Sequence, residues 1–230
     1  MAHTYLSWDK KIITDFASEN INSLYNQGYV FTRAGWGRMD QTRSLRIDLK
    51  KFKLTSENKR VLKKAEAMEL KTSSIPYSDY HWSIGKLATD FYTKKFGAGT
   101  FSANKAKELM TNKDKSNFNV LLQFVLPSEA SRTQPDDPSP AAVGYCVARE
   151  TDEILHYCYP FYNTESAIPN LGMGMMLRAI LYASEAGKKF IYLGSFQRPG
   201  DSYKLQFEGL EWWDGLRWTD DIEKLKIILN

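Results

Sequence analysis

A glycine-rich turn with the composition of an anion-binding site occurs at Pro169-Asn-Leu-Gly-Met-Gly174. A helix that begins there offers backbone N–H groups without intrahelical acceptors and the positive end of its dipole. Glycine lets a phosphate group approach this backbone closely. The turn therefore predicts a site for a phosphate-bearing carrier, formed by Asn170, Leu171, Gly172, Met173 and Gly174. A Gly-x-Gly pattern alone is equally typical of a helix that packs tightly on a sheet.

Positive charge is concentrated between residues 41 and 64, where nine basic residues stand against two acidic ones. This segment carries a net charge of +7, whereas the whole chain carries +4. Such a surface suits RNA phosphates, which are bound mainly through charge. The predicted contacts are Arg43, Arg46, Lys59, Arg60, Lys63 and Lys64. A solvated helix face explains the same pattern. Arg43 and Arg46 are expected on one strand face, where they could instead bind an acceptor carboxylate.

Apolar periodicity predicts an α+β fold, a mixed and mostly antiparallel sheet flanked by helices. Helices are expected near residues 9–27, 59–68, 83–97, 103–112, 172–186 and 202–207, and strands near 29–32, 44–50, 118–126, 142–149, 154–162, 189–193 and 216–218. Residues 127–140 are rich in Pro, Ser and Asp, which indicates a mobile loop. The glycine-rich turn thus stands between two antiparallel strands and a helix that leads into another strand.

Composition excludes several classes of protein. Cys146 and Cys158 form no CxxC or Cys/His cluster, so zinc and iron–sulfur sites are not expected. We expect no metal site of any kind. The first 20 residues do not resemble a signal peptide, and no apolar run approaches about 20 residues. We therefore expect a cytoplasmic protein without a membrane partner. No Ser-His-Asp pattern is present either.

The order of elements around the turn resembles the GNAT acyltransferase core, which binds the pyrophosphate of acyl-CoA at Gln/Arg-x-x-Gly-x-Gly/Ala. Pro169 stands at the first position here. Tyr162, Leu171-Gly172, Tyr192-Leu193-Gly194, Lys204 and Trp212-Trp213 are similar to the C-terminal domain of arginyl-tRNA–protein transferases and of bacterial relatives that leucylate N-terminal Asp or Glu.

A second block, about residues 33–64, resembles the N-terminal part of that family through Thr42-Arg-Ser-Leu-Arg46 and Phe52-Lys-Leu-Thr-Ser56. The family's N-terminal cysteine motif is absent; the corresponding region is Arg33 to Gln41. The resemblance implies a basic N-terminal region at residues 1–115, packed on or part of the core. It also implies a GNAT-like acyltransferase domain at residues 116–230.

The resemblance implies an aminoacyltransferase that moves an amino acid from aminoacyl-tRNA to an amine on a protein N-terminus, a peptide or a small molecule. The partners would be tRNA and the amine acceptor, with aminoacyl-tRNA as co-substrate and no other cofactor. An acetyl-CoA-dependent N-acetyltransferase and a non-catalytic binding module of the same fold are the alternatives. Pro169 favours loss of the CoA contact, and the basic segment favours tRNA.

Transfer from an activated ester requires orientation, a route for the amine proton and stabilisation of an oxyanion, but no enzyme nucleophile. The resemblance to GNAT folds implies that Tyr203 donates a proton to the leaving group, although ordinary core packing explains a tyrosine there equally well. Ser195 and Gln197, just past the strand at 189–194, could orient the amine. Tyr162 and Tyr192 would line the acceptor pocket, and Lys204 would bind tRNA or acceptor. His156 is either a base or a packed strand residue.

Overall fold

The computed structural model describes residues 5–127 and 142–228. The chain forms two compact units, each assembled from segments that are far apart in the sequence. Unit one contains Met1–Thr55, Glu150–His156 and Ala183–Asn230, and unit two contains Ser56–Arg149 and Tyr157–Tyr182. The predicted loop at 127–140 lies outside the described residues, except for Pro127. The division at residue 115 remains an expectation.

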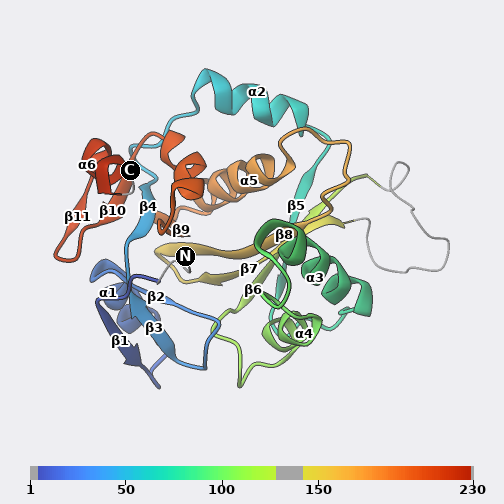
Figure 1. Ribbon diagram of the computed structural model, residues 1–230, viewed down its shortest axis with the longest axis horizontal. Helices are drawn as coiled ribbons and strands as arrows, with labels where there is room; N and C mark the ends of the chain where they lie inside the picture. Colours follow the sequence, from blue (N-terminus) through green and yellow to red (C-terminus); the bar gives the residue numbers. More distant parts are fainter. Residues whose placement is uncertain (1–4, 128–141, 229–230) are drawn as a thin grey trace. The chain divides into compact units, whose positions relative to one another are not determined.

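Unit one contains two sheets (Figure 1). Strands β1 (Asp9–Ile12), β3 (Arg38–Gln41) and β2 (Tyr29–Phe31) pair antiparallel in that order, and α1 (Ser18–Asn26) joins β1 to β2. The second sheet has the order β11-β10-β4-β9-β8, with β4 at Ser44–Asp48, β9 at Phe190–Ser195, β10 at Leu210–Trp213 and β11 at Trp218–Thr219. Of β8 (Ile154–Tyr162), residues 154–156 belong to this unit and the rest to unit two. A 3₁₀ helix, η1 (Pro199–Gln206), and α6 (Ile222–Ile228) complete the unit.

Unit two contains the strand order β5-β6-β7-β8, of which β5 (Glu69–Ser74), β6 (Val120–Val125) and β7 (Ala142–Glu150) pair antiparallel (Figure 1). Its helices are α2 (Ser56–Lys64), α3 (Trp82–Phe96), α4 (Ala103–Thr111) and most of α5 (Leu171–Glu185). Within the described residues, no helix is long and apolar enough to cross a membrane.

The β-α-β unit that the sequence predicts is present. The crossover helix α5 follows β8, and β9 then pairs parallel with the first residues of β8, Ile154 opposite Phe190 and His156 opposite Tyr192. Seven pairs are antiparallel: β1–β3, β2–β3, β4–β9, β4–β10, β5–β6, β6–β7 and β10–β11. The structure thus confirms the α+β class, with a mixed, mostly antiparallel sheet flanked by helices, and the GNAT-like order of elements.

Glycine lets α5 approach its neighbours closely in unit two. A Cβ atom on Gly144 of β7 would lie 2.7 Å from Sδ of Met175. A Cβ atom on Gly174 would lie 3.0 Å from the Cβ atom of Ala65. Both distances are shorter than an ordinary van der Waals contact. Part of the glycine content near the turn is therefore a packing requirement.

An aromatic and imidazole cluster fills the core of unit one. The hydroxyl oxygen of Tyr25 lies 2.8 Å from Nδ1 of His156, and the ring of Tyr25 packs edge-on against Tyr192 at 4.8 Å. His156 is 3% exposed. Burial disfavours the charged imidazolium and, with the nearby charge of Lys204, lowers the pKa of His156 to about 3. His156 is therefore a neutral, packed strand residue at neutral pH.

Several predicted elements differ from the structure. The predicted helix at 9–27 is wrong in its first part, because residues 9–12 pair with β3 and only Ser18–Asn26 is helical. Residues 202–207, predicted as an α-helix, belong to the 3₁₀ helix η1. The sequence did not indicate β3, β5, β10 or α6. Pairing with distant strands decides the first case, since local propensity is a weak term.

We predict that His156 makes the protein less stable in acid. The unfolded chain binds a proton near pH 6.5, whereas folded His156 stays neutral until about pH 3. Its contribution is therefore complete above pH 6.5 and declines as the pH falls toward 3, by about 2 kcal/mol between pH 6.5 and 5. Urea unfolding of wild type and His156→Asn at both pH values measures this difference. Equal pH dependence in the two proteins would contradict it.

Candidate functional site

The carboxyl end of β9 carries a backbone irregularity beside several predicted site residues. Ser44 pairs with Ser195 but Arg46 pairs with Tyr192, so the register shifts between these two pairs. Gly194, within the shifted stretch, has a φ of +79°, which favours glycine. A bulge of this kind redirects the residues that follow it, and such bulges are common beside active sites.

Lys204 lies buried against this bulge. Its Nζ donates a hydrogen bond to the carbonyl oxygen of Ser195 at 2.9 Å and lies 3.8 Å from Oδ1 of Asp201. The side chain of Lys204 is 10% exposed. Burial lowers the pKa of Lys204, and the Asp201 carboxylate opposes this shift. A buried lysine with a lowered pKa is characteristic of functional sites.

The 3₁₀ helix η1 holds Lys204 in this position. The carboxylate of Asp201 accepts hydrogen bonds from the backbone N–H groups of Gln197 at 2.9 Å and Arg198 at 3.3 Å. Pro199 lies in the first turn, where a missing N–H group costs nothing. These contacts fix the loop between β9 and η1 and direct Lys204 back to the strand end.

The structure brings Ser195, Tyr203 and Lys204 together at this end of β9. Nζ of Lys204 lies 5.7 Å from the ring centre of Tyr203, and Tyr203 is 46% exposed and so accessible to a substrate. Gln197 is also nearby, but its side-chain amide bonds to Leu6 and Thr42. The sequence indicated Ser195, Gln197, Tyr203 and Lys204. It did not indicate Asp201, whose carboxylate accepts from the backbone of Gln197 and lies beside Lys204.

Arg46 and Tyr192 are buried rather than open to a ligand. Arg46 lies 2.8 Å from Glu211, and its guanidinium group stacks between the rings of Phe190 and Trp218. Tyr192 is fully buried, and burial is the main cause that raises its pKa to about 12. In this structure both residues form the core of unit one.

Arg43 lies just before β4, which begins at Ser44. The expectation that Arg43 and Arg46 share a strand face is therefore wrong, and their spacing of three residues also reverses the face. Burial lowers the pKa of Arg43. In the part of the chain that the structure describes, its Nε is buried without a hydrogen-bond partner.

The glycine-rich turn lies in unit two at the start of α5. Asn170 has a φ of +59°, and its carbonyl oxygen accepts hydrogen bonds from the N–H groups of Met173 and Gly174, both at 2.9 Å. A Cβ atom on Gly172 would lie 2.8 Å from the ring of Tyr162. The predicted acceptor-pocket residue Tyr162 and the predicted carrier turn are therefore neighbours. Leu171 is buried and Asn170 is exposed.

The basic segment is divided between the two units, since Arg43 and Arg46 lie in unit one and α2 lies in unit two. On α2, Asn58 and Val61 are buried and pack inward. The basic residues of the helix are all exposed: Lys59, Arg60, Lys63 and Lys64. Arg60 pairs with Glu57 at 2.6 Å. Helix α2 therefore presents a basic, solvent-facing surface.

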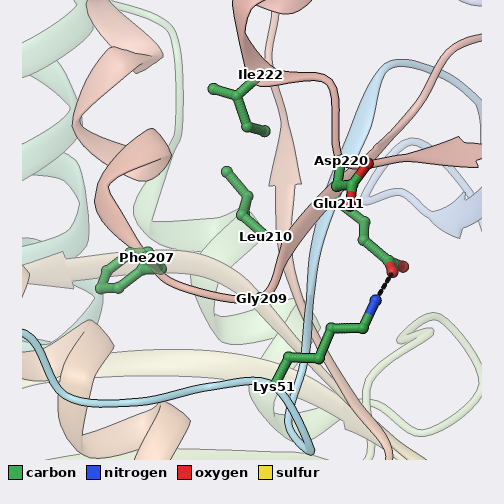
Figure 2. Close-up of a pocket in the computed structure, with 7 residues that line it drawn as sticks. All are labelled: Lys51, Phe207, Gly209, Leu210, Glu211, Asp220 and Ile222. Carbon is green, nitrogen blue, oxygen red and sulfur yellow. Dashed lines mark hydrogen bonds and ion pairs between the residues drawn. The ribbon is translucent and has the colours of Figure 1, made fainter.

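Unit one also contains a pocket that the sequence did not indicate, with a volume of about 270 Å³ (Figure 2). Apolar side chains of Phe207, Leu210 and Ile222 line one part, and Lys51, Glu211 and Asp220 supply charge. Lys51 pairs with Glu211 at 3.2 Å. None of the predicted site residues lines this pocket.

The described residues contain no group of three His, Cys, Asp or Glu side chains that could hold a metal ion. Cys146 and Cys158 are both buried free thiols, and burial raises the pKa of each. The Sγ atom of Cys146 donates to the carbonyl oxygen of Cys158 at 2.9 Å.

No protein-family model matches the chain. Two solved structures are distantly similar. L-PGS from Bacillus licheniformis is 12% identical with a TM-score of 0.47, covering 79% of this chain and 50% of its own. FemX is 11% identical with a TM-score of 0.46, covering 77% and 59%.

Curated relatives match over more of the sequence. The chain is 25% identical over 222 residues to the aspartate/glutamate leucyltransferase of Dinoroseobacter shibae, which is 91% of this chain and 76% of the relative. The protein of the same name from Ruegeria pomeroyi is 24% identical, over 91% and 77%. That from Cereibacter sphaeroides is 36% identical over 78 residues, 33% of this chain and 28% of its own. Over most of its length, this chain is thus similar to proteins named aspartate/glutamate leucyltransferase.

Proposed function

We propose that this protein is an aminoacyl-tRNA-dependent aminoacyltransferase that transfers leucine to the amine of an acidic acceptor, an N-terminal aspartate or glutamate. The observation that carries the proposal is the similarity over 222 residues to proteins named aspartate/glutamate leucyltransferase. The GNAT-like order of strands and helices supports it, because that core catalyses acyl transfer to amines. The basic surface of α2 supports RNA as the carrier of the acyl group.

In the proposed reaction, the neutral amine nitrogen of the acceptor attacks the ester carbonyl carbon of leucyl-tRNA. A C–N bond forms, the C–O bond to the terminal ribose breaks, and the proton lost by the amine passes to the ribose oxygen. Negative charge develops on the former carbonyl oxygen before the ester bond breaks. A fixed cation in a site from which water is largely excluded stabilises such charge most effectively.

The group at the end of β9 supplies the functions that this reaction requires. Lys204 is the only cation buried at this strand end among the described residues, and we assign it the stabilisation of the oxyanion. Tyr203, beside it and open to solvent, would protonate the ribose oxygen. Ser195, whose carbonyl oxygen accepts from Lys204, and Gln197, whose backbone N–H donates to Asp201, would orient the amine.

The donor is tested by incubating the full chain with [¹⁴C]leucyl-tRNA, or separately with [¹⁴C]acetyl-CoA, and a peptide that begins with Asp or Glu. We expect label to enter the peptide from leucyl-tRNA alone. A peptide of the same composition that begins with Lys is the control and should stay unlabelled, because its side-chain charge is reversed. Transfer from acetyl-CoA alone, or from neither donor, would contradict the proposal.

We predict that removing charge from α2 weakens tRNA binding. The variant Lys59→Ala/Lys63→Ala/Lys64→Ala should bind tRNA at least tenfold more weakly in low salt. It should also reduce the slope of log K against log salt concentration by about 2, because fewer counterions are released. Filter binding over a series of salt concentrations measures both.

The matched control for α2 is Lys95→Ala/Lys107→Ala/Lys113→Ala, which removes three exposed lysines elsewhere in unit two. It should bind tRNA nearly as wild type does. If tRNA binding weakens equally in the two triple variants, the loss reflects net charge in general, and a specific tRNA contact at α2 is refuted.

We predict that Lys204→Met lowers kcat for leucyl transfer by about 10²-fold with little change in tRNA affinity. In the wild type, kcat should fall with rising pH as Lys204 loses its proton, at a pH below that of an ordinary lysine. The control is Lys188→Met, which removes a half-buried lysine of unit one that pairs with Glu150 at 3.0 Å. Equal losses of kcat in the two variants would show that only folding is affected.

A further inference from the structure

The side chains of Gln197 and Thr42 hold the main chain of one residue in the N-terminal segment. Oε1 of Gln197 accepts from the backbone N–H of Leu6 at 2.9 Å, and Nε2 of Gln197 donates to the carbonyl oxygen of Leu6 at 3.4 Å. The hydroxyl of Thr42 donates to the same carbonyl oxygen at 2.5 Å. Nε2 of Gln197 also donates to Oγ1 of Thr42 at 2.7 Å, so the two side chains act together.

This contact recognises main chain rather than side chain. A primary amide presents one acceptor and one donor side by side, which matches the N–H and C=O groups of a peptide. Leu6 and Ser7 are only half-buried, and Tyr5 and Trp8 are 47% and 41% exposed. Residues 5–7 belong to no helix or strand. Any polypeptide of suitable conformation could therefore offer Gln197 and Thr42 the same two groups.

The contact lies next to the proposed reaction site. Gln197 is two residues beyond Ser195, a separation of at most about 7 Å along the chain. Asp201 accepts from the backbone N–H of Gln197 and also lies beside Lys204. The same carboxylate therefore positions both the main-chain contact and the buried cation. An acceptor held by Gln197 would have its adjacent residues close to Ser195.

We propose that Gln197 and Thr42 form a binding site for the main chain of the acceptor polypeptide, which Leu6 of this chain occupies as an internal competitor. The inference rests on the proposed function, because it takes the acceptor to be a polypeptide. It explains why Gln197, beside Ser195, is engaged with the chain's own N-terminal segment. Displacement of Leu6 frees the amide and the hydroxyl for the acceptor.

Two variants at Leu6 distinguish the contribution of its main chain to the contact from that of its side chain. Leu6→Pro removes the N–H group that Gln197 accepts from, whereas Leu6→Ala keeps it. The probe is a hexapeptide that begins with Asp and carries fluorescein at its C-terminus, followed by fluorescence anisotropy with the full chain. We expect Leu6→Pro to bind the probe about tenfold more tightly than wild type, and Leu6→Ala to match wild type.

A second variant, which lacks residues 2–7, keeps the test valid if Leu6→Pro folds poorly. It should also bind the probe more tightly, and adding Gln197→Ala to it should abolish the gain. Unchanged or weaker binding in both Leu6→Pro and the deletion variant would overturn the proposal and leave the contact as an anchor for the N-terminal segment.

The leucyl-transfer assay separates the internal competitor from the proposed function. If leucine is transferred but the KM for the peptide is the same in wild type and Leu6→Pro, the internal competitor is refuted and the proposed function stands. If no transfer occurs with any variant, the proposed function fails, and probe binding alone still decides the main-chain site.

Discussion

The buried ion pair between Arg46 and Glu211 is the interaction on which unit one depends. The guanidinium group of Arg46, on β4, binds Glu211 of β10 and lies 3.9 Å from the ring centre of Phe190 on β9 and 4.1 Å from that of Trp218 on β11. It also donates to Asn26 at 3.2 Å. One side chain thus contacts three neighbouring strands and the end of α1. Removing the carboxylate of such a pair costs about 3–5 kcal/mol, since the charge of Arg46 stays buried without its partner.

The candidate site follows from the strand order that this ion pair stabilises. With β4 and β9 held in register through Ile47 and Ile191, the shift at Gly194 falls at the end of β9. The carbonyl oxygen of Ser195 then meets Lys204, and the following loop is fixed by Asp201. The neutral His156 packs in the same core and adds no charge there at neutral pH. A rigid sheet edge and a short 3₁₀ helix are therefore enough to place a buried cation.

Much of this architecture can be predicted from the sequence, for identifiable reasons. Strands such as Ile154–Tyr162 and helix α5 have strong periodicity and clear boundaries, and they were predicted almost to the residue. Asp9–Ile12 was not, because its strand state depends on pairing with Arg38–Gln41 rather than on local preference. β10 and α6 are short, and contacts with distant residues stabilise them, such as the hydrogen bond from Trp212 to Asp221.

The same limit applies to the site. The resemblance to GNAT folds indicated Tyr203 and the resemblance to the transferase family indicated Lys204, whereas Ser195 was indicated by its place at the end of the last core strand. The burial of Arg46 could not be predicted, because its partner Glu211 lies 165 residues away. The engagement of Gln197 with Leu6 is likewise a contact across 191 residues. A sequence shows where charged residues are concentrated, but only the fold determines which of them form ion pairs.

The most direct test of the central claim is tandem mass spectrometry of a peptide that begins with Asp, after incubation with the protein and leucyl-tRNA. We predict a peptide extended by one leucine on its α-amino group, formed only when the protein and the charged tRNA are both present. An unmodified peptide would contradict the proposed leucyl transfer, as would a peptide acetylated in a parallel reaction with acetyl-CoA.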